Sequence, residues 1–384
     1  MKSRRILTAA LCALICGWLL SGPAVLGIEP DQPRPPVETD VFVSGADGVH
    51  TYRIPAMIVS PGGALLVFCE ARKESIRDAS PTDMVLKRST DGGRTWSPAQ
   101  VLIQGEGTEA MMNPCPVVDA ATGTIVLVSI NAHKIEKGHH RHLMMTSTDD
   151  GKTWSQPVDL GRRITPYDDT FVSGPGVGIQ TTGGRLVVPG YVGKFDEKTR
   201  TGCYSCALYS DDHGRSWTLG QKVSACTNEC QVVERADGTL MLNMRENTGK
   251  SCRAVATSRD GGQTWSQPYW DRALNECPCQ ASFIRYRGAP HGRSMLLFAN
   301  PDVSGERYGV VKRTRMAVKF SYDEGKTWPV EKLIHPGPSS YSSLARLPDG
   351  DVGLVYEGGH EHRREWIRFA RLSLAWLTDG RDRP

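Results

Sequence analysis

Ser89-Thr90-Asp91-Gly92-Gly93-Arg94-Thr95-Trp96 is the first of five copies of one eight-residue pattern. Every copy reads Ser-x-Asp-x-Gly-x-Thr/Ser-Trp, and successive copies begin 48 to 63 residues apart, at Ser89, Ser147, Ser210, Ser258 and Ser321. The Asp carboxylate can accept bonds from nearby backbone amides and the Gly can take a positive φ, so each copy is typical of a hairpin turn. The closing Trp must bury a large apolar area, and we expect it to clamp each turn onto its own sheet. Self-similarity at this period predicts an array of supersecondary units.

Short β-strands are predicted for most of the chain. Six aliphatic or β-branched runs each follow a Gly-containing turn: 64–69, 125–130, 185–189, 239–244, 294–298 and 352–356. No segment has a convincing helical period. Six such strands with five turns between them predict an all-β fold, a six-bladed β-propeller with five Asp-box turns. The ligand of a propeller lies where strand ends and loops meet on one face.

The first 27 residues predict a secretory signal peptide, because Lys2, Arg4 and Arg5 precede a mostly apolar run that closes in small residues at Gly27. We therefore expect a secreted or periplasmic protein without a stable membrane anchor. A proline-rich linker is expected over 28–38 and the propeller over 39–384. Removal of residues 1–27 lowers the formal net charge from +4 to +1, so no basic field remains to attract nucleic acid.

The segment Tyr52-Arg53-Ile54-Pro55 looks like the YRIP motif of the sialidases, and the repeated turns are the Asp boxes, or BNR repeats, of that family. The chain resembles bacterial-type secreted sialidases over residues 45–360. The resemblance implies a retaining exo-α-sialidase that releases terminal α-linked sialic acids from glycoproteins, glycolipids and oligosaccharides. Its partners would be sialylated glycans. No cofactor or metal is expected to be needed, and we expect a monomer.

Three arginines match the arginine triad of the family: Arg53, Arg245 and Arg307. Sialic acid carries a carboxylate on its anomeric carbon, and planar, permanently charged guanidinium groups are suited to holding it. The resemblance assigns the triad to that carboxylate. It also assigns Glu357 to orienting Arg53, and Arg72 to a further contact near the 4-hydroxyl of the sugar.

Tyr341 and Glu229 match the nucleophile of the family and the base that activates it. A carboxylate nucleophile would be repelled by the carboxylate of the substrate, whereas a Tyr hydroxyl arrives neutral, and sialidases depart from the two-carboxylate scheme of glycosidases in this way. A Tyr with a pKa of about 10 is inert at neutral pH without a base beside it.

Asp78 matches the acid/base Asp that protonates the leaving oxygen. It lies in a loop after Glu70-Ala71-Arg72, which resembles the strand-end Glu-x-Arg of the family. Asp83 is the alternative, because the length of this loop varies. The pKa of the proton donor would have to rise, through desolvation when substrate closes the site.

Nine of the eleven cysteines follow residue 27, and seven of these lie between Cys203 and Cys279. Disulfides are favoured for an exported chain. The spacing Cys203-x2-Cys206 and Cys226-x3-Cys230 keeps structural zinc as an alternative.

Three functions remain open at this point. Hydrolysis of terminal α-sialosides is favoured. A trans-sialidase, or a hydrolase for a related nonulosonic acid, would share the same residues. A non-catalytic glycan-binding propeller would need only the arginines, so Tyr341, Glu229 and Asp78 together argue against it.

Overall fold

The structure is a computed structural model. It describes residues 33–78, 80–132, 140–161, 164, 171–196, 198–199, 201–287, 294–303 and 312–382. The expected signal peptide and residues 28–32 of the expected linker lie outside the described residues. The strand β1 (Val37–Val43) begins two residues before the boundary expected at residue 39. In the described part no helix is long and apolar enough to cross a membrane.

Antiparallel strands that follow one another in the chain pair in groups of about four. The first three groups are β2 (Thr51–Val59), β3 (Leu65–Arg72), β4 (Thr82–Ser89) and β5 (Gln100–Ile103); β6 (Ala110–Asp119), β7 (Thr124–Ala132), β8 (His140–Ser147) and β9 (Val158–Asp159); and β10 (Phe171–Ser173), β11 (Ile179–Gln180), β12 (Leu186–Asp196), β13 (Thr201–Ser210) and β14 (Thr218–Leu219). β4 and β6 share one parallel pairing, so the first two groups form one eight-stranded sheet.

The second half of the chain repeats this arrangement. It contains β15 (Thr227–Glu234), β16 (Leu240–Glu246), β17 (Cys252–Ser258) and β18 (Tyr269–Asn275); β19 (Ser282–Tyr286), β20 (Met295–Pro301), β21 (Thr314–Ser321) and β22 (Val330–Arg346); and β23 (Val352–Gly358), β24 (Trp366–Leu372) and the short helix α1 (Leu374–Leu377). The long β22 pairs with β21 through its first half and with β23 through its second half. β1 pairs with β24, which joins the two ends of the described chain in one sheet.

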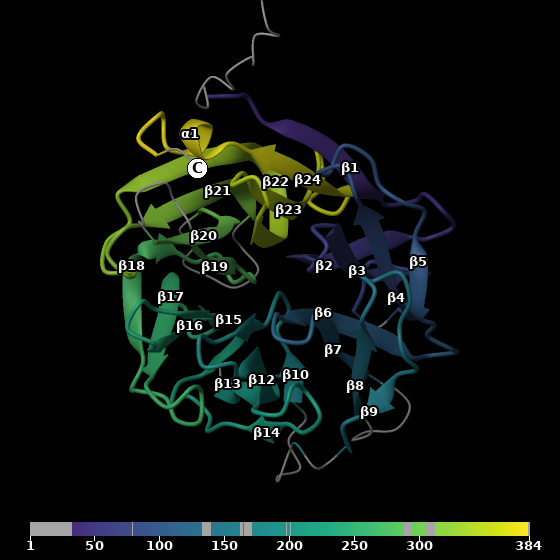
Figure 1. The fold of residues 1–384 in the computed structure, drawn as a ribbon, viewed down its shortest axis with the longest axis horizontal. Helices are drawn as coiled ribbons and strands as arrows, with labels where there is room; N and C mark the ends of the chain where they lie inside the picture. Colours follow the sequence, from purple (N-terminus) through teal and green to yellow (C-terminus); the bar gives the residue numbers. More distant parts are fainter. Residues whose placement is uncertain are drawn as a thin grey trace, which may run out of the picture. The chain divides into compact units, whose positions relative to one another are not determined.

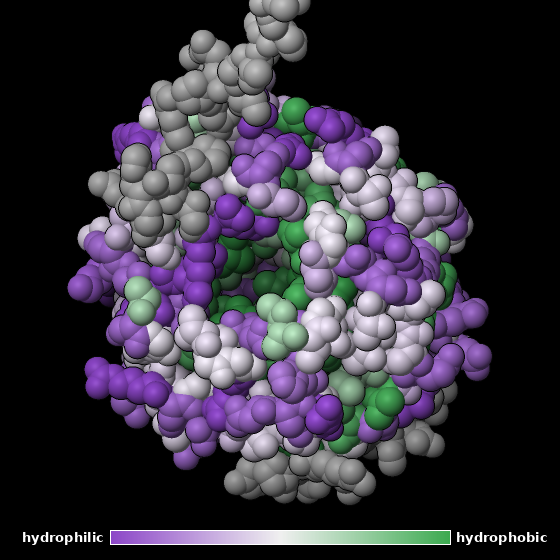
Figure 2. All heavy atoms as spheres, viewed as in Figure 1, coloured by the Kyte–Doolittle hydropathy of each residue, from purple (hydrophilic) through white to green (hydrophobic). Residues whose placement is uncertain are grey.

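The sheets lie around a common centre (Figure 1), and the face seen in Figure 2 is hollowed there, with hydrophobic residues inside and mostly hydrophilic residues around it. The prediction of an almost purely β chain is confirmed. All six runs predicted as strands coincide with observed strands, namely β3, β7, β12, β16, β20 and β23.

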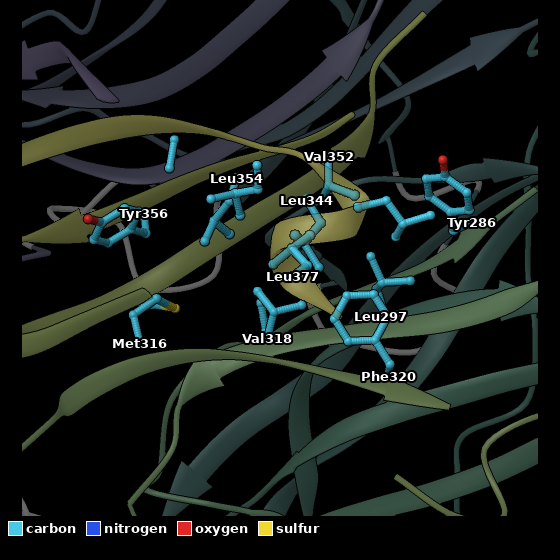
Figure 3. Packing of buried hydrophobic residues seen from close by; sticks show 14 of the residues in the cluster. Tyr286, Leu297, Met316, Val318, Phe320, Leu344, Val352, Leu354, Tyr356 and Leu377 are labelled. Carbon is cyan, nitrogen blue, oxygen red and sulfur yellow. The ribbon is translucent and has the colours of Figure 1, made fainter. Parts of the chain in front are cut away.

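The core lies between neighbouring groups of strands because both faces of a strand are buried. Along β23, Val352, Leu354 and Tyr356 join one hydrophobic cluster with β20, β21 and α1 (Figure 3), whereas Val355 joins another cluster with Phe369. This alternation has the period of two that a strand requires. β23 is therefore packed on both of its faces.

The repeated turns make the bonds that their residue types predict. In the first copy, the Asp91 carboxylate accepts from the Thr95 hydroxyl at 2.6 Å and from the Thr95 amide at 3.0 Å. Gly93, with φ of +88°, donates to the Ser89 hydroxyl at 2.9 Å. The equivalent bonds are present in the copies that begin at Ser147, Ser210, Ser258 and Ser321.

The Trp residues of two of these turns pack against strands outside their own group. The ring of Trp96 packs edge-on against Phe369 of β24, and Trp154 packs against Phe68 of β3. Both partners belong to a different group of strands from the turn itself. The expectation that each turn is clamped to its own sheet is therefore wrong for Trp96, whose partner Phe369 lies in another sheet. Phe68 lies in the same eight-stranded sheet as the turn of Trp154, but in the other group of strands.

The favoured disulfides are not present. All nine cysteines after residue 27 lie in the described part of the chain, and all are free thiols. Most are buried in strands; the Cys230 thiol, for example, donates to the Gly190 carbonyl at 3.1 Å. No group of His, Cys, Asp and Glu in the described residues could hold a metal ion, so the cysteine spacing does not assemble a zinc site there.

Candidate active site

Four strands are bulged at the positions that carry the predicted site. The ladder is interrupted between Arg53 and Ala56 in β2, between Met112 and Cys115 in β6, between Thr227 and Cys230 in β15, and between Ser339 and Ser342 in β22. A bulge leaves residues unpaired and re-aims their side chains. Pro55 and Pro114 lack the amide that a regular ladder would use. The interruptions release Glu229 and Tyr341 from the ladder.

Tyr341, Glu229 and Arg245 are in direct contact. The Tyr341 hydroxyl donates to Oε1 of Glu229. Nη1 of Arg245 lies 2.5 Å from Oε2 of Glu229 and 3.2 Å from the Tyr341 oxygen. All three residues are less than a tenth exposed. Glu229 therefore has one oxygen on the phenol and one on a permanent cation.

Burial raises the pKa of Tyr341 well above its ordinary value, and the negative charge of Glu229 raises it further, while Arg245 and Arg313 oppose this. The phenol is therefore neutral near pH 7. It cannot be a nucleophile unless its proton leaves, and the atom that already accepts its hydrogen bond is Oε1 of Glu229.

Arg53 is held by Glu357, as the resemblance implied. Nε of Arg53 lies 2.8 Å from Oε1 of Glu357, which also accepts from the Ile54 amide at 2.7 Å. Burial disfavours the charge of Arg53, but Glu357 outweighs this effect and raises the pKa of the guanidinium. Burial likewise opposes the charge of Glu357, and Arg53 nevertheless holds the pKa of that carboxyl below its ordinary value. The Arg53 guanidinium lies over the Tyr341 ring, 5.0 Å from its centroid.

Arg307 lies outside the described residues. Another arginine, Arg313, approaches the same tyrosine: its guanidinium carbon is 5.7 Å from the Tyr341 ring centroid. Arg313 donates to the Ser340 hydroxyl at 3.0 Å and to the Pro278 carbonyl. It immediately precedes β21. The described residues thus bring three arginines to Tyr341, namely Arg53, Arg245 and Arg313.

Arg72 joins two carboxylates. It donates to Oε2 of Glu70 through Nε at 3.0 Å and Nη2 at 2.6 Å, and Nη2 is also 2.8 Å from Oδ1 of Asp78. A further bond to the Ile76 carbonyl at 2.7 Å ties Arg72 to the loop that carries Asp78. Asp83 is engaged elsewhere, since it pairs with Lys73 at 2.7 Å and accepts from the Gly105 amide.

The pKa of Asp78 is lowered in this state. Burial acts to raise it, but the positive charges of Arg72 and Arg53 outweigh burial. The side chain of Asp78 is 74% exposed, which leaves it accessible to an incoming ligand. The pKa of Asp78 would therefore have to rise when substrate closes the site if this residue is the proton donor.

A cavity of about 650 Å³ brings these groups together. Arg72, Asp78, Glu229 and Tyr341 contribute to its lining, and so do polar and apolar side chains that could contact a sugar: Met112, Asn113, Ile130, Val172, Tyr191 and Asn228. Asp83 does not line this cavity.

Two kinds of residue escaped the sequence analysis. Arg313 directly precedes a strand whose alternating Met316, Val318 and Phe320 end at a repeated turn, and this position is the signal by which it could have been noticed. Arg363 and Arg364 also interact electrostatically with Arg53. Nothing in their local sequence separates them from an ordinary charged hairpin.

Comparison with known proteins identifies the family of the chain. The BNR repeat-like domain matches residues 50–354. The chain is 36% identical to human Sialidase-4 over 91% of this chain and 95% of that protein. The chain belongs to the sialidase family. The sialidase of Micromonospora viridifaciens is 34% identical over 97% of this chain, which spans 61% of that relative.

Solved sialidase structures share the fold. The Hadza microbial sialidase Hz136 has a TM-score of 0.79 and 31% identity, covering 89% of this chain and 69% of that one. A leech intramolecular trans-sialidase has a TM-score of 0.75 at 21% identity, covering 89% of this chain and 71% of that chain, and so resembles it in fold alone. The nearly helix-free β architecture is consistent with the sialidase β-propeller.

Proposed function

We propose that this protein is a retaining exo-α-sialidase that hydrolyses terminal α-linked sialic acids of glycoproteins, glycolipids and oligosaccharides. The observation that carries the proposal is the contact of the buried Tyr341 hydroxyl with Glu229, beside Arg245, in one cavity with Asp78. A glycan-binding protein would need the arginines but no base on a neutral phenol. Sialidase relatives add family-level support.

Arg53, Arg245 and Arg313 would bind the substrate carboxylate, with Arg313 in the place first assigned to Arg307. Glu357 would keep Arg53 in position. Guanidinium groups already held by carboxylates lose little freedom when they bind an anion, so the site would be preorganised. The substrate carboxylate would place the anomeric carbon above the Tyr341 oxygen.

The reaction would proceed by two displacements. In the first, the Tyr341 oxygen forms a bond to the anomeric carbon while its proton moves to Oε1 of Glu229. The bond from that carbon to the leaving oxygen breaks, and Asp78 supplies the proton that the departing alcohol needs. In the second, Asp78 removes a proton from water, the water oxygen displaces the Tyr341 oxygen, and Tyr341 recovers its proton from Glu229. The sugar would retain its configuration.

The remaining expectations are part of the same proposal. The groups of strands would close into a six-bladed propeller with Asp boxes in five blades, supported by the pairing of β1 with β24. The N-terminal segment would direct the chain to the periplasm or the medium, where the protein would act as a monomer. Transfer to a second sugar, or action on a related nonulosonic acid, would use the same groups.

The test is release of the fluorophore from an aryl α-sialoside by wild type and by Tyr341→Phe. Loss of nearly all turnover in Tyr341→Phe, with the fold intact by circular dichroism, supports the proposal. Analysis of the products in the presence of lactose separates hydrolysis from transfer. A folded wild type that releases nothing would reject the proposal, and titration with free sialic acid would then test simple binding.

A further inference from the structure

A short hairpin beside the site contains two arginines that the proposed reaction does not use. Residues 359–365 connect Gly358, at the end of β23, to Trp366, at the start of β24, and these two residues pair with each other. Glu357, which holds Arg53, lies just before this turn. The hairpin therefore begins directly beside the arginines of the site, and it carries Arg363 and Arg364.

The hairpin has a defined backbone. The Glu365 carboxylate accepts bonds from three successive amides, those of His360 at 2.9 Å, Glu361 at 2.8 Å and His362 at 2.6 Å. The Gly359 amide also donates to the Pro338 carbonyl at 3.1 Å. These bonds fix the direction in which Arg363 and Arg364 leave the chain.

Neither guanidinium group has a hydrogen-bond or ion-pair partner among the residues that the structure describes. Both side chains are half-buried, and Nε of each is shielded from solvent without a bond. A buried donor left unsatisfied costs free energy, and more so when it is charged. Binding of an anion to these two guanidinium groups would therefore stabilise them.

Like charges surround both side chains. Arg363 is repelled by Arg313 and Arg53, and Arg364 by Arg53 and Arg363; burial and this repulsion lower the pKa of both, that of Arg364 to about 10. Six arginines and four carboxylates interact around the site: Arg53, Arg72, Arg245, Arg313, Arg363 and Arg364 with Glu70, Asp78, Glu229 and Glu357.

The position of Arg364 indicates which part of a substrate would meet it. Arg364 also interacts with Arg72, and Arg72 lies 2.8 Å from Asp78. In the proposed reaction Asp78 serves the leaving oxygen. Arg364 also interacts electrostatically with Asp78 itself, and Arg363 precedes Arg364 in the same hairpin.

We propose that Arg363 and Arg364 form a second anion site, which binds a carboxylate or sulfate ester on the sugar that bears the leaving oxygen. The inference rests on the proposed function and adds substrate selectivity to it. Two guanidinium groups on adjacent residues provide several N–H donors for the oxygens of such a group.

The experiment compares three substrates at low ionic strength. 3′-Sialyllactose has a neutral leaving sugar, α2,8-linked disialic acid has a carboxylate on it, and 3′-sialyllactose sulfated on its galactose has a sulfate ester. We expect kcat/KM for at least one anionic substrate to exceed that for the neutral one about tenfold, because a charge-assisted hydrogen bond discriminates by this order. The favoured substrate identifies the source of the anion.

The double variant R363Q/R364Q should bring this ratio close to one, and R363K/R364K should keep part of it. The matched control R94Q/R215Q removes two exposed arginines from repeated turns and should leave the ratio unchanged. A wild type that hydrolyses all three substrates equally, or a ratio that survives in R363Q/R364Q, overturns the anion site and leaves the proposed function intact. If no sialoside is hydrolysed, the proposed function fails. Calorimetric titration with disialic acid then decides on the anion site, which is rejected if wild type and R363Q/R364Q bind equally.

Discussion

The Tyr341 hydroxyl donates to one oxygen of Glu229 while Arg245 lies 2.5 Å from the other oxygen of the same carboxylate. The carboxylate thus connects a neutral phenol to a permanent cation in a buried setting. Arg245 would stabilise a charge on either partner as the proton moves between them. Because Arg245 also lies 3.2 Å from the phenol oxygen, the three groups act as a unit.

The first prediction concerns Glu229. Glu229→Gln keeps the shape of the side chain but removes its ability to take the phenol proton. We expect kcat to fall by about 10²- to 10⁴-fold, the usual contribution of a positioned base. The measurement is steady-state hydrolysis of an aryl α-sialoside. Glu234→Gln is the control, since Glu234 lies on the same strand but pairs with Arg287 outside the cavity. Equal activities of the two variants would contradict the role of Glu229.

The second prediction decides between Arg313 and Arg307. Arg313→Ala should cost about 2–5 kcal/mol of transition-state stabilisation, as truncation of a buried charged contact does. That is roughly a 30- to 5,000-fold loss in kcat/KM. Arg315→Ala controls for the local sequence, because Arg315 is exposed. If Arg307→Ala shows the larger loss and Arg313→Ala is nearly normal, the original assignment of Arg307 to the triad holds.

The third prediction concerns stability. Glu357→Gln leaves Arg53 buried without its countercharge, and we expect the free energy of unfolding at pH 7 to fall by about 3–5 kcal/mol. The pKa of Glu357 is lower in the folded protein than its ordinary value of 4.5. Its contribution is therefore fully present above pH 4.5 and is lost as pH falls through the folded pKa. Urea unfolding of wild type and variant should differ most at neutral pH and converge in acid.

Glu38→Gln is the control for this prediction. Glu38 pairs with Arg368 at 3.3 Å on the surface, and exposed pairs contribute about 0–1 kcal/mol. A Glu357→Gln variant that is no less stable than Glu38→Gln would show that the Arg53 pair does not stabilise the fold.

Much of the structure could be predicted because its determinants are local. The Asp91 turn depends on residues within a span of eight, and the strands that follow Gly-containing turns have the composition of strands. Motifs singled out Tyr341, Glu229 and Arg53 as candidates. Their mutual contact depends on bulges in β15 and β22, and no sequence pattern states which two residues of a strand will be left unpaired.

The errors share a physical cause. Trp96 and Trp154 pack their rings against a neighbouring group of strands, which the turn sequence does not specify. The expected export of the chain suggested disulfides and the cysteine spacing suggested zinc, but strand geometry decides which thiols meet. Arg363 and Arg364 resemble a solvated pair in sequence, and only the position of their hairpin beside Arg53 distinguishes them.

The last prediction is the pH dependence of the proton donor. Arg72 and Arg53 outweigh burial and lower the pKa of Asp78 below its ordinary 3.8, so in the free enzyme little of it is protonated above pH 4. For a substrate whose leaving group must be protonated by Asp78, kcat/KM should fall about tenfold for each unit of rising pH. We expect this fall for 3′-sialyllactose, whose leaving alcohol is strongly basic. A nitrophenyl sialoside should show a shallower fall.

Arg72→Gln removes the nearest positive charge, so the pKa of Asp78 should rise and the fall in kcat/KM should begin at higher pH. The measured quantity is the pH at which kcat/KM begins to fall. Arg72→Gln can also weaken substrate binding, but weaker binding alone does not change this pH. Asp78→Asn should abolish the fall in kcat/KM with rising pH. Asp83→Asn should preserve this fall, since Asp83 is paired with Lys73 away from the cavity. The opposite result for these two variants would make Asp83 the proton donor, and the loop from Lys73 to Ser80 would then have to rearrange when substrate binds.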